Sequence, residues 1–293
     1  MPSADDRHDS PPDHEQAADR AGTPFGELTE GGIELAGALA GGGLGLIGGP
    51  AGALAGAALG VALTRGLKVA VSRLITHREE ERMDAAVVLI AEDAKHRAEE
   101  GEQIRDDGFF DERGHLRPDA EELLEGVLRH AAQTYEESKV LVLARFYSGL
   151  AHDASVDAPQ AHLLLRQIAA LTYRQIVALS VIAQRSRYAD SLVQTHAIHT
   201  ETSGHPGGDP TIQVELSVLA ADQLLGAESS SGQVVPVGAL IDGAGNIPAN
   251  VGYGRLALLS GGETIVRLAQ LAETVTDDER ADWLDALRGP SSW

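Results

Sequence analysis

Cysteine is absent from the 293 residues of this chain, aromatic residues are scarce, and no long stretch is basic. Without cysteine the chain can form neither a disulfide framework nor a thiolate metal site or nucleophile. Aromatic residues make up 4% of the chain, so the hydrophobic core must be built from aliphatic side chains. The formal net charge of −21 argues against a dominant nucleic-acid-binding role, because contacts to phosphate supply most of the non-specific affinity.

The most distinctive pattern is a Gly/Ala-rich apolar run at residues 33–63, in which Glu34 is the only ionisable residue. Residues four apart lie above one another on an α-helix, so a glycine at every fourth position makes a stripe where another helix can approach closely. The glycines of this run form two such rows, which are Gly37, Gly41, Gly45 and Gly49, and Gly48, Gly52, Gly56 and Gly60. In water each glycine costs about 1 kcal/mol relative to alanine. In lipid the backbone must satisfy its own hydrogen bonds, which imposes the helix. The run therefore predicts a segment that inserts into a membrane or packs within one.

Three membrane geometries fit the length of this run. A spanning helix needs about 20 residues. The 31 residues therefore allow one tilted span, a short re-entrant hairpin, or a hairpin lengthened by residues 64–75. We favour a close-packed re-entrant or conditional hairpin, since the two glycine rows meet at a plausible turn and the Ala/Gly content makes insertion marginal. The turn would be formed by Gly48, Gly49 and Pro50, and the basic residues that flank the membrane would be Arg65, Lys68 and Arg73. For a single span these bases place the C-terminal bulk in the cytoplasm.

Three alternative readings of residues 33–63 do not involve a membrane. A flexible linker is disfavoured, because Ser and Thr are absent and Leu, Ile and Val are interspersed. A tightly packed soluble hairpin must offset the cost of its glycines by tertiary packing. Residues 43–48 also match the dinucleotide-binding pattern GxGxxG, but no β-branched strand precedes them and no acidic residue follows at the required distance.

The rest of the chain divides by composition. Residues 1–30 are rich in Asp, Pro and small polar residues, which predicts a disordered acidic tail. This tail lacks the basic start and the cleavage site of a secretory signal, so we expect a cytoplasmic protein that meets the inner membrane from inside, in a conditional manner. The predicted units are the tail at 1–30, a glycine-zipper membrane-interacting segment at 31–64, a helical bundle at 65–188, a linker at 189–209 and a helix-hairpin-helix unit at 210–293.

Within the bundle, apolar residues at helical spacing predict one helix from about residue 65 to 101 and a second from Pro118 to about His152. The second helix is expected to bury Leu124, Leu128 and Tyr135 among others. Two shorter helices, at 158–171 and 173–188, are predicted from capping pairs. The capping pairs are Asp157 with Gln160 and Thr172 with Gln175.

The C-terminal unit is expected to contain a helix at 210–225 and a hairpin of residues 234–241 with residues 246–254, turning at 243–246. Two helices then begin at the capping pairs Ser260 with Glu263 and Thr276 with Glu279. This order is compatible with a winged-helix module, by analogy of fold alone. Residues 189–293 carry 14 acidic and four basic residues, so a protein contact or dimerisation is preferred to DNA binding.

Histidines in the linker are the only candidate metal ligands. His196, His199 and His205 have a spacing that zinc can use, with Glu201 nearby. No predicted helix or strand fixes their geometry, so we expect neither a metal nor a cofactor. No Ser–His–Asp or paired-carboxylate arrangement supports a catalytic site, and the protein is predicted to be non-enzymatic.

Two families resemble parts of this pattern. The glycine rows resemble glycine-zipper membrane proteins, which include pore-forming and conditionally inserting segments. The phrase Leu259-Ser260-Gly261-Gly262-Glu263, followed by Leu268, resembles bacterial Abi-alpha-type proteins of abortive infection. The resemblance implies an oligomeric helical protein that permeabilises or anchors to a membrane in phage defence.

The predicted fold class is mainly α, with a glycine-zipper helical hairpin, a helical bundle and a small winged-helix-like α+β unit. The expected partners are membrane lipid, further copies of the chain and an unknown protein. The alternatives are a soluble scaffold protein with an internally packed glycine hairpin, and a winged-helix regulator.

Overall fold

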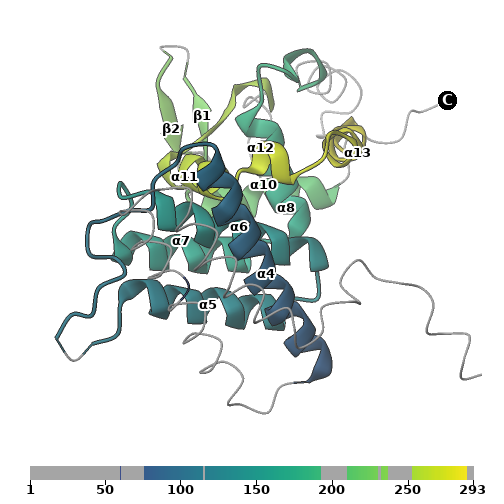
Figure 1. Ribbon diagram of the computed structural model, residues 1–293. Helices are drawn as coiled ribbons and strands as arrows, with labels where there is room; N and C mark the ends of the chain where they lie inside the picture. Colours follow the sequence, from purple (N-terminus) through teal and green to yellow (C-terminus); the bar gives the residue numbers. More distant parts are fainter. Residues whose placement is uncertain are drawn as a thin grey trace, which may run out of the picture.

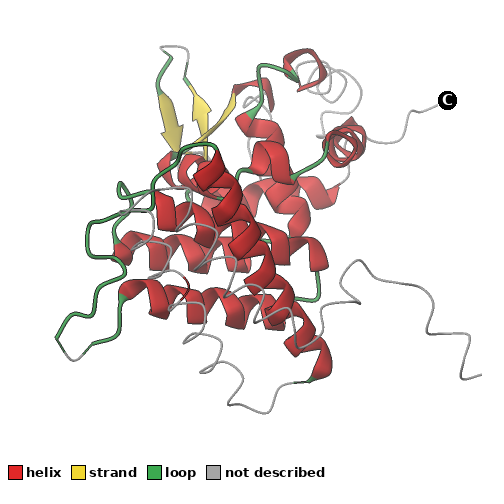
Figure 2. Cartoon of the chain, in the orientation of Figure 1, coloured by secondary structure: helices red, strands yellow, loops and turns green. Residues whose placement is uncertain are grey.

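The computed structural model describes residue 60 and residues 76–114, 116–192, 210–229, 232–236 and 253–288. In these residues the protein is mainly helical, with one small three-stranded antiparallel sheet (Figure 1 and Figure 2). This confirms the predicted fold class at the level of a mainly α protein with a small β element. None of the described helices is long and apolar enough to cross a membrane. The acidic tail and, apart from Gly60, the glycine-zipper segment lie outside the described residues.

Five helices between residues 77 and 183 pack as a bundle. They are α4 (His77–Glu99), α5 (Asp119–Gln133), α6 (Glu137–His152), α7 (Ala158–Ala170) and α8 (Tyr173–Ala183). The longest of them, α4, packs on both α5 and α6 and runs diagonally across the bundle in Figure 1.

The first helix of the bundle begins later than the sequence pattern predicts. Thr76 has an extended backbone, with φ −74° and ψ 157°, and its hydroxyl accepts a hydrogen bond from the N–H of Glu79. The Glu79 carboxylate in turn accepts from the Thr76 N–H at 2.7 Å, which completes a capping box. Because an N-cap residue lies outside its helix, the predicted start near residue 65 is wrong, and α4 begins at His77.

The single helix predicted from Pro118 to His152 is also wrong, because it is two helices. Thr134 and Glu136 leave the helical region of the backbone, with ψ of 140° and 101°, and separate α5 from α6. The apolar face restarts after this break. Tyr135, which was expected on the buried face, lies in the connection and is 83% exposed.

The capping residues predicted for α7 and α8 are confirmed. The Asp157 carboxylate accepts from the Gln160 N–H, and Thr172 forms a reciprocal capping box with Gln175. The structure ends α8 at Ala183, five residues before the predicted end at 188.

The C-terminal elements follow the predicted order of helix, strands and helices. They are α10 (Pro210–Ala221), β1 (Leu225–Glu228), β2 (Val234–Pro236), the 3₁₀-helix η3 (Tyr253–Arg255), β3 (Leu256–Leu258), α11 (Ser260–Leu268), α12 (Leu271–Thr274) and α13 (Asp277–Arg288). The sheet order is β2-β1-β3, and both pairs are antiparallel. β2 pairs with β1, through Glu228 opposite Val234, a pairing that the sequence did not predict. The predicted pairing of residues 234–241 with 246–254 stays a prediction, because residues 237–252 are not described. The predicted turn at 243–246 lies outside the described residues.

Two positive φ angles mark where α10 and α11 end, and α10 stops before the predicted end at 225. Gln223, at φ 57°, follows the end of α10, so that Leu225 begins a strand. Gln270, at φ 46°, separates α11 from α12. The capping box at Thr276 is confirmed, with Glu279 accepting from the Thr276 N–H at 2.8 Å. The box predicted at Ser260 is wrong, because Ser260 is already helical and the cap residue Leu259 offers no side-chain oxygen.

The bundle and the C-terminal elements share one hydrophobic core. Buried residues from α4 through α13 form a single cluster, and α6 lies at its centre with Phe146 and Tyr147 fully buried. α6 packs on α4, α5, α7, α11 and α12. The domain boundary predicted at 189–209 stays a prediction, since residues 193–209 are not described.

A glycine of α6 permits the closest approach between the two halves of this core. A Cβ atom added to Gly149 would lie 2.9 Å from the Cα of Leu268, the last residue of α11, and still closer to its carbonyl oxygen. Gly126 of α5 differs, because its added Cβ would meet only the Leu165 Cδ2 atom, at 2.8 Å. The end of the Leu165 side chain can move away from an added Cβ atom, whereas the backbone of Leu268 cannot.

We predict that Gly149→Ala lowers the free energy of unfolding by about 1–3 kcal/mol or more, the usual effect of overpacking, despite the better helix propensity of alanine. Gly126→Ala is the matched control and should stay within about 1 kcal/mol of the parent protein, because Leu165 can change rotamer. Chemical denaturation of the two variants tests this. Equal stabilities would contradict the close approach of α6 and α11.

Candidate functional site

Most residues of the predicted site lie outside the described part of the chain. Gly60 is the exception, and it is α-helical and buried. The remaining members of the two glycine rows, the turn, the flanking bases and the linker histidines are not described: Gly37, Gly41, Gly45, Gly49, Gly48, Gly52, Gly56, Pro50, Arg65, Lys68, Arg73, His196, His199 and His205. The structure therefore neither brings these residues together nor separates them.

The described residues instead gather buried cations at the ends of helices. Four basic side chains are at most 7% exposed, and each donates to a backbone carbonyl. Three of these carbonyls lie near the C-terminal end of a helix, and the fourth belongs to Leu271, the first residue of α12. The four donors are Arg97 to Leu268 of α11, Arg105 to Leu150 of α6, Lys139 to Ala169 of α7 and Arg280 to Leu271 of α12. The last carbonyls of a helix have no intrahelical partner and carry its partial negative charge, so a buried cation is stabilised there.

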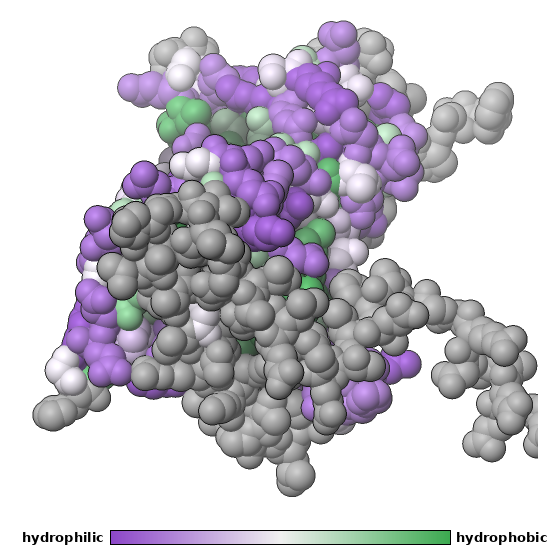
Figure 3. Space-filling view, in the orientation of Figure 1, coloured by the Kyte–Doolittle hydropathy of each residue, from purple (hydrophilic) through white to green (hydrophobic). Residues whose placement is uncertain are grey.

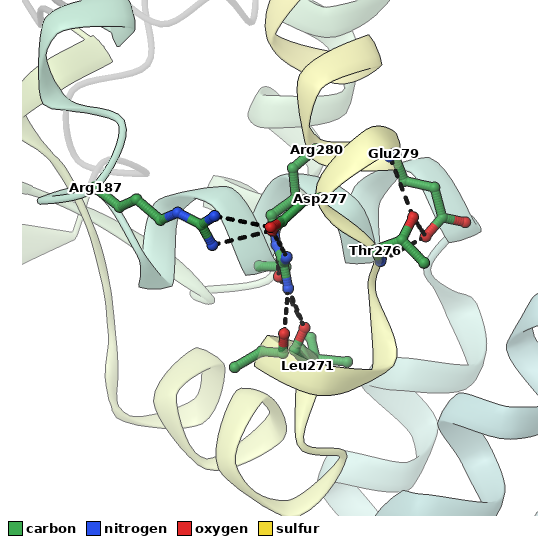
Figure 4. A network of polar contacts seen from close by, with 8 residues as sticks. Arg187, Leu271, Thr276, Asp277, Glu279 and Arg280 are labelled. Atoms are coloured by element: carbon green, nitrogen blue, oxygen red, sulfur yellow. Dashed lines mark hydrogen bonds and ion pairs between the residues drawn. The ribbon is translucent and has the colours of Figure 1, made fainter.

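The most extensive of these sites is the Arg280 cluster, formed by Ser180, Arg187, Leu271, Asp277 and Arg280. Figure 4 shows Arg187, Leu271, Asp277 and Arg280 of this cluster. Arg280 Nε donates to Ser180 Oγ at 2.9 Å, Nη1 donates to Asp277 Oδ1 at 2.7 Å, and Nη2 donates to the Leu271 carbonyl at 3.0 Å. The Ser180 hydroxyl donates to the same carbonyl at 2.9 Å. The cluster thus joins α8, α12 and α13.

Asp277 connects this buried cluster to the surface. Its carboxylate accepts two hydrogen bonds from the guanidinium of Arg187, at 3.0 and 2.8 Å, in addition to the bond from Arg280. The bonds from Arg187 hold the pKa of Asp277 below its ordinary value. Asp277 is also the first residue of α13, where the helix dipole favours a negative charge.

A second cluster, the Asp93 cluster, joins α4 and α6 to the C-terminal elements. It contains Asp93, Arg97, Glu102, Arg145 and Thr274. Arg97 Nε donates to Asp93 Oδ2 at 2.7 Å, and its Nη1 donates to Glu102 Oε2 at 3.1 Å. Arg145 Nε lies 3.5 Å from Asp93 Oδ1, and Arg145 Nη1 donates to Thr274 Oγ1 at 2.9 Å. The buried carboxylate of Asp93 therefore binds Arg97 of its own helix and Arg145 of α6, and Arg145 connects it to Thr274 of α12.

His152 lies beside the Asp93 cluster. Its Nδ1 is 2.8 Å from the Ser148 carbonyl, which can only accept, so Nδ1 carries the proton. Its Nε2 is buried and has no hydrogen-bond partner among the described residues. Burial lowers the pKa of His152, the bond to Ser148 opposes this, and the charge of Arg97 lowers it further. The imidazole is held neutral.

The Arg280 and Asp93 clusters bind helices to one another, and most of their polar groups are already used in hydrogen bonds. The guanidinium groups of Arg97 and Arg280 are used by carboxylates, a hydroxyl and carbonyls, and the Ser180 hydroxyl is used by Leu271. In the described part of the chain no three His, Asp or Glu side chains are grouped so that they could hold a metal ion. The clusters are best explained as the links that make one body of the bundle and the C-terminal elements.

Sequence reasoning missed both clusters. The only local signals are the spacings of Asp93 to Arg97 and of Asp277 to Arg280, which are typical of ion pairs on a helix surface. These spacings do not predict that the ion pairs are buried, because the residues that bury them lie far away in the sequence. Arg97, for example, reaches Leu268 across 171 residues.

Comparison of the chain with protein-family models, with curated proteins and with solved structures yields no match. The resemblance to glycine-zipper and Abi-alpha-type proteins therefore stays a prediction. The class of protein that the structure defines is a mainly α protein with a small antiparallel sheet.

We predict that Arg280→Lys lowers the free energy of unfolding by about 3 kcal/mol, because a lysine has a single donor group and cannot reach the hydroxyl, the carboxylate and the carbonyl together. Arg288→Lys on the same helix is the control. Arg288 pairs with Asp285 at the surface, where such a pair contributes about 0–1 kcal/mol. Thermal and chemical unfolding would measure both. A loss below about 1 kcal/mol in Arg280→Lys would contradict the proposed linking role.

The low pKa of His152 predicts acid sensitivity. The unfolded chain takes up a proton near the ordinary value of 6.5, whereas the folded protein resists it. The stabilising effect is therefore complete above pH 6.5 and is lost as the pH falls towards the folded pKa, with a slope of up to about 1.4 kcal/mol per pH unit.

Chemical denaturation from pH 7.5 to 5.5 checks this prediction. His152→Gln, which keeps a donor for Ser148 and cannot titrate, should flatten the dependence. His162→Gln, at an exposed position of α7, is the control and should leave it unchanged. An unaltered slope in His152→Gln would show that this imidazole does not set the acid sensitivity.

Proposed function

We propose that the protein is a non-enzymatic, membrane-associating protein that engages lipid through residues 33–63. One observation carries the proposal, which is the absence of any charged side chain between Glu34 and Arg65, together with glycine at every fourth position. A run of this length can enter a bilayer as one tilted span or as a re-entrant hairpin. The glycine rows allow close helix packing, which favours association of several copies.

The net negative charge of the folded body supports the proposal that residues 33–63, and not the folded body, make the contact with lipid. Residues 67–188 carry 21 acidic and 16 basic residues, and residues 189–293 carry 14 and four. An anionic lipid surface repels a body of this charge, so contact with the membrane depends on the apolar segment. The bases next to the segment, Arg65, Lys68 and Arg73, would lie at the headgroups.

The outcome of membrane engagement would be permeabilisation or anchoring at the inner face of a cytoplasmic membrane. The family resemblance suggests phage defence as the setting. The folded body would hold or release the segment and would contact a protein partner.

One described residue favours a second candidate function. Gly60 belongs to the second glycine row and is helical and buried. Burial of this row against protein is what a soluble scaffold protein with an internally packed glycine hairpin requires. The two candidates are compatible if the segment is packed first and released later, so the proposed membrane contact is conditional. A winged-helix regulator has less support, because the C-terminal elements are acidic.

Flotation with liposomes tests the membrane proposal. The intact chain, in an activated state, should float with vesicles and release an entrapped dye, whereas a chain without residues 31–64 should stay in the dense fraction. Circular dichroism of the shortened chain must show that its helices are retained. Recovery of the intact chain wholly in the dense fraction, with every lipid composition tried, would refute the proposal.

Leucine substitution separates the two candidate functions. With Gly41, Gly45, Gly52 and Gly56 replaced by Leu, a membrane segment should still partition into lipid, with altered oligomers, because hydrophobicity rises. A soluble packed hairpin should instead lose stability and aggregate, because the added side chains fill the close helix contact.

A further inference from the structure

Helix α10 presents an uncharged strip to the solvent. The side chains of α10 that the structure describes as exposed are Thr211, Val214, Val218 and Ala221, and these four residues are called the α10 strip below. At about 100° of rotation per residue they lie within about 80° of one another, on one side of the helix. Val214 is 63% exposed and Val218 is 39% exposed. Two valines are therefore left in water on one side of a helix, in a chain whose net charge is −21.

The polar side chains of α10 are used on its other sides. Glu215, the only charged residue of the helix, is 8% exposed, and its Oε2 lies 3.3 Å from Nε of Arg174 in α8. The Gln213 amide donates to the hydroxyl of Tyr253. The Ser217 hydroxyl donates to the Gln213 carbonyl of its own helix at 2.7 Å. The strip therefore has no charged side chain of its own helix and is suited to apolar contact.

The spacing of the strip is symmetric. Its members are separated by steps of three, four and three residues, so the strip reads the same in both directions about a centre at Leu216. A two-fold axis beside this centre places a second copy of α10 antiparallel to the first. Val214 then faces Val218 of the second copy. Steps of three and four residues are also those by which two helices pack side by side in a coiled coil. A dimer with two-fold symmetry requires a self-complementary surface of this kind.

The charge at the end of the helix also favours an antiparallel second copy. Asp222 directly follows α10, is half-buried and lies beside the strip at the same rotation per residue. In the antiparallel arrangement its carboxylate comes to the N-terminal end of the other α10, where the helix dipole favours a negative charge. A parallel arrangement would instead bring the two Asp222 carboxylates together. Because two copies of net charge −21 repel one another, an uncharged surface lowers the cost of their contact.

We propose that the α10 strip is the dimer interface for a second copy of this chain, with the two α10 helices antiparallel across a two-fold axis. A helix of this length extends over about 18 Å, so the contact falls in the weak class of interfaces, which bury less than about 1,200 Å² in total. The dimer is therefore reversible, and its population depends on the protein concentration.

This inference goes beyond the proposed function, because the dimer needs neither lipid nor residues 33–63. On a membrane the same contact would gain from the high local concentration of bound chains, so that pairing of the folded bodies would accompany association of the glycine rows. Sedimentation in the absence of vesicles measures the dimer, and flotation measures membrane binding, so each can fail alone.

Analytical ultracentrifugation of the full-length chain without lipid tests the interface. The average mass should rise towards that of a dimer between about 5 and about 500 μM, the range in which weak interfaces associate. Val214→Glu combined with Val218→Glu should stay monomeric, because four carboxylates would meet in the dimer. Leu116→Glu combined with Leu163→Glu adds the same charge at exposed positions outside α10, and this control should associate as the parent protein does. A monomeric parent protein, or a Val214/Val218 variant that associates as strongly as the parent, would overturn the proposal.

A charge exchange tests whether the occupant is a second copy. Val214→Lys combined with Val218→Lys should also be monomeric by itself. Mixed in equal amounts with the Glu variant of the same two positions, it should form a heterodimer, since each lysine faces a glutamate across the two-fold axis. Circular dichroism must show that both variants keep their helices. Failure of the two folded variants to associate would contradict the proposed interface.

Disulfide formation tests the direction of the two helices. The chain has no cysteine, so an introduced thiol is unique. A mixture of the Val214→Cys and Val218→Cys proteins should form the mixed disulfide dimer several times faster than either protein forms a dimer by itself, as measured by mass spectrometry. Faster dimers of each protein by itself would indicate parallel helices. A rate equal to that of Leu163→Cys, an exposed control in α7, would indicate no contact at α10. Either of these results overturns the proposal.

Discussion

Burying a cation in an acidic, mainly aliphatic protein requires acceptors, and backbone carbonyls at the ends of helices supply them. Arg97, Arg105 and Lys139 each donate to a carbonyl in the last turn of a helix, and Arg280 donates to the carbonyl of Leu271, the first residue of α12. The interaction satisfies both partners, since neither the cation nor the carbonyl can be buried alone without a large loss. Each bond also joins two segments, so the hydrogen bonds that satisfy the carbonyls at the helix ends also hold those ends in place.

The position of α6 follows from these contacts. Its neighbours approach from several sides, and Gly149 removes the side chain where the end of α11 comes closest. The carbonyl of Leu268 at that point receives Arg97 from α4. Close backbone approach and a buried charge therefore occur at one place, which fixes the end of α11 against α6. The described residues in Figure 3 present a mostly hydrophilic surface, with a hydrophobic cluster over the β1–β2 region, where Val234 and Val235 are exposed.

The sequence predicted what local chemistry decides. The caps at Asp157, Thr172 and Thr276 mark real helix starts, because a cap depends on residues within one turn. Breaks were missed where the backbone leaves the helix without a glycine or proline, as at Thr134 and Gln270. The pairing of β2 with β1, and the burial of Asp93 and Arg280, depend on distant partners that no local pattern reveals. The predicted glycine site is testable mainly through Gly60, so its residues stay a prediction.

The cap at Thr76 has a consequence for the membrane hypothesis. A helix that ran unbroken from the apolar segment into α4 would transmit any movement of the segment into the core through a rigid rod. The extended backbone of Thr76 instead separates the two, so α4 can keep its contacts with α5 and α6 while the preceding chain changes position. The folded body then does not have to open for the Gly/Ala run to leave.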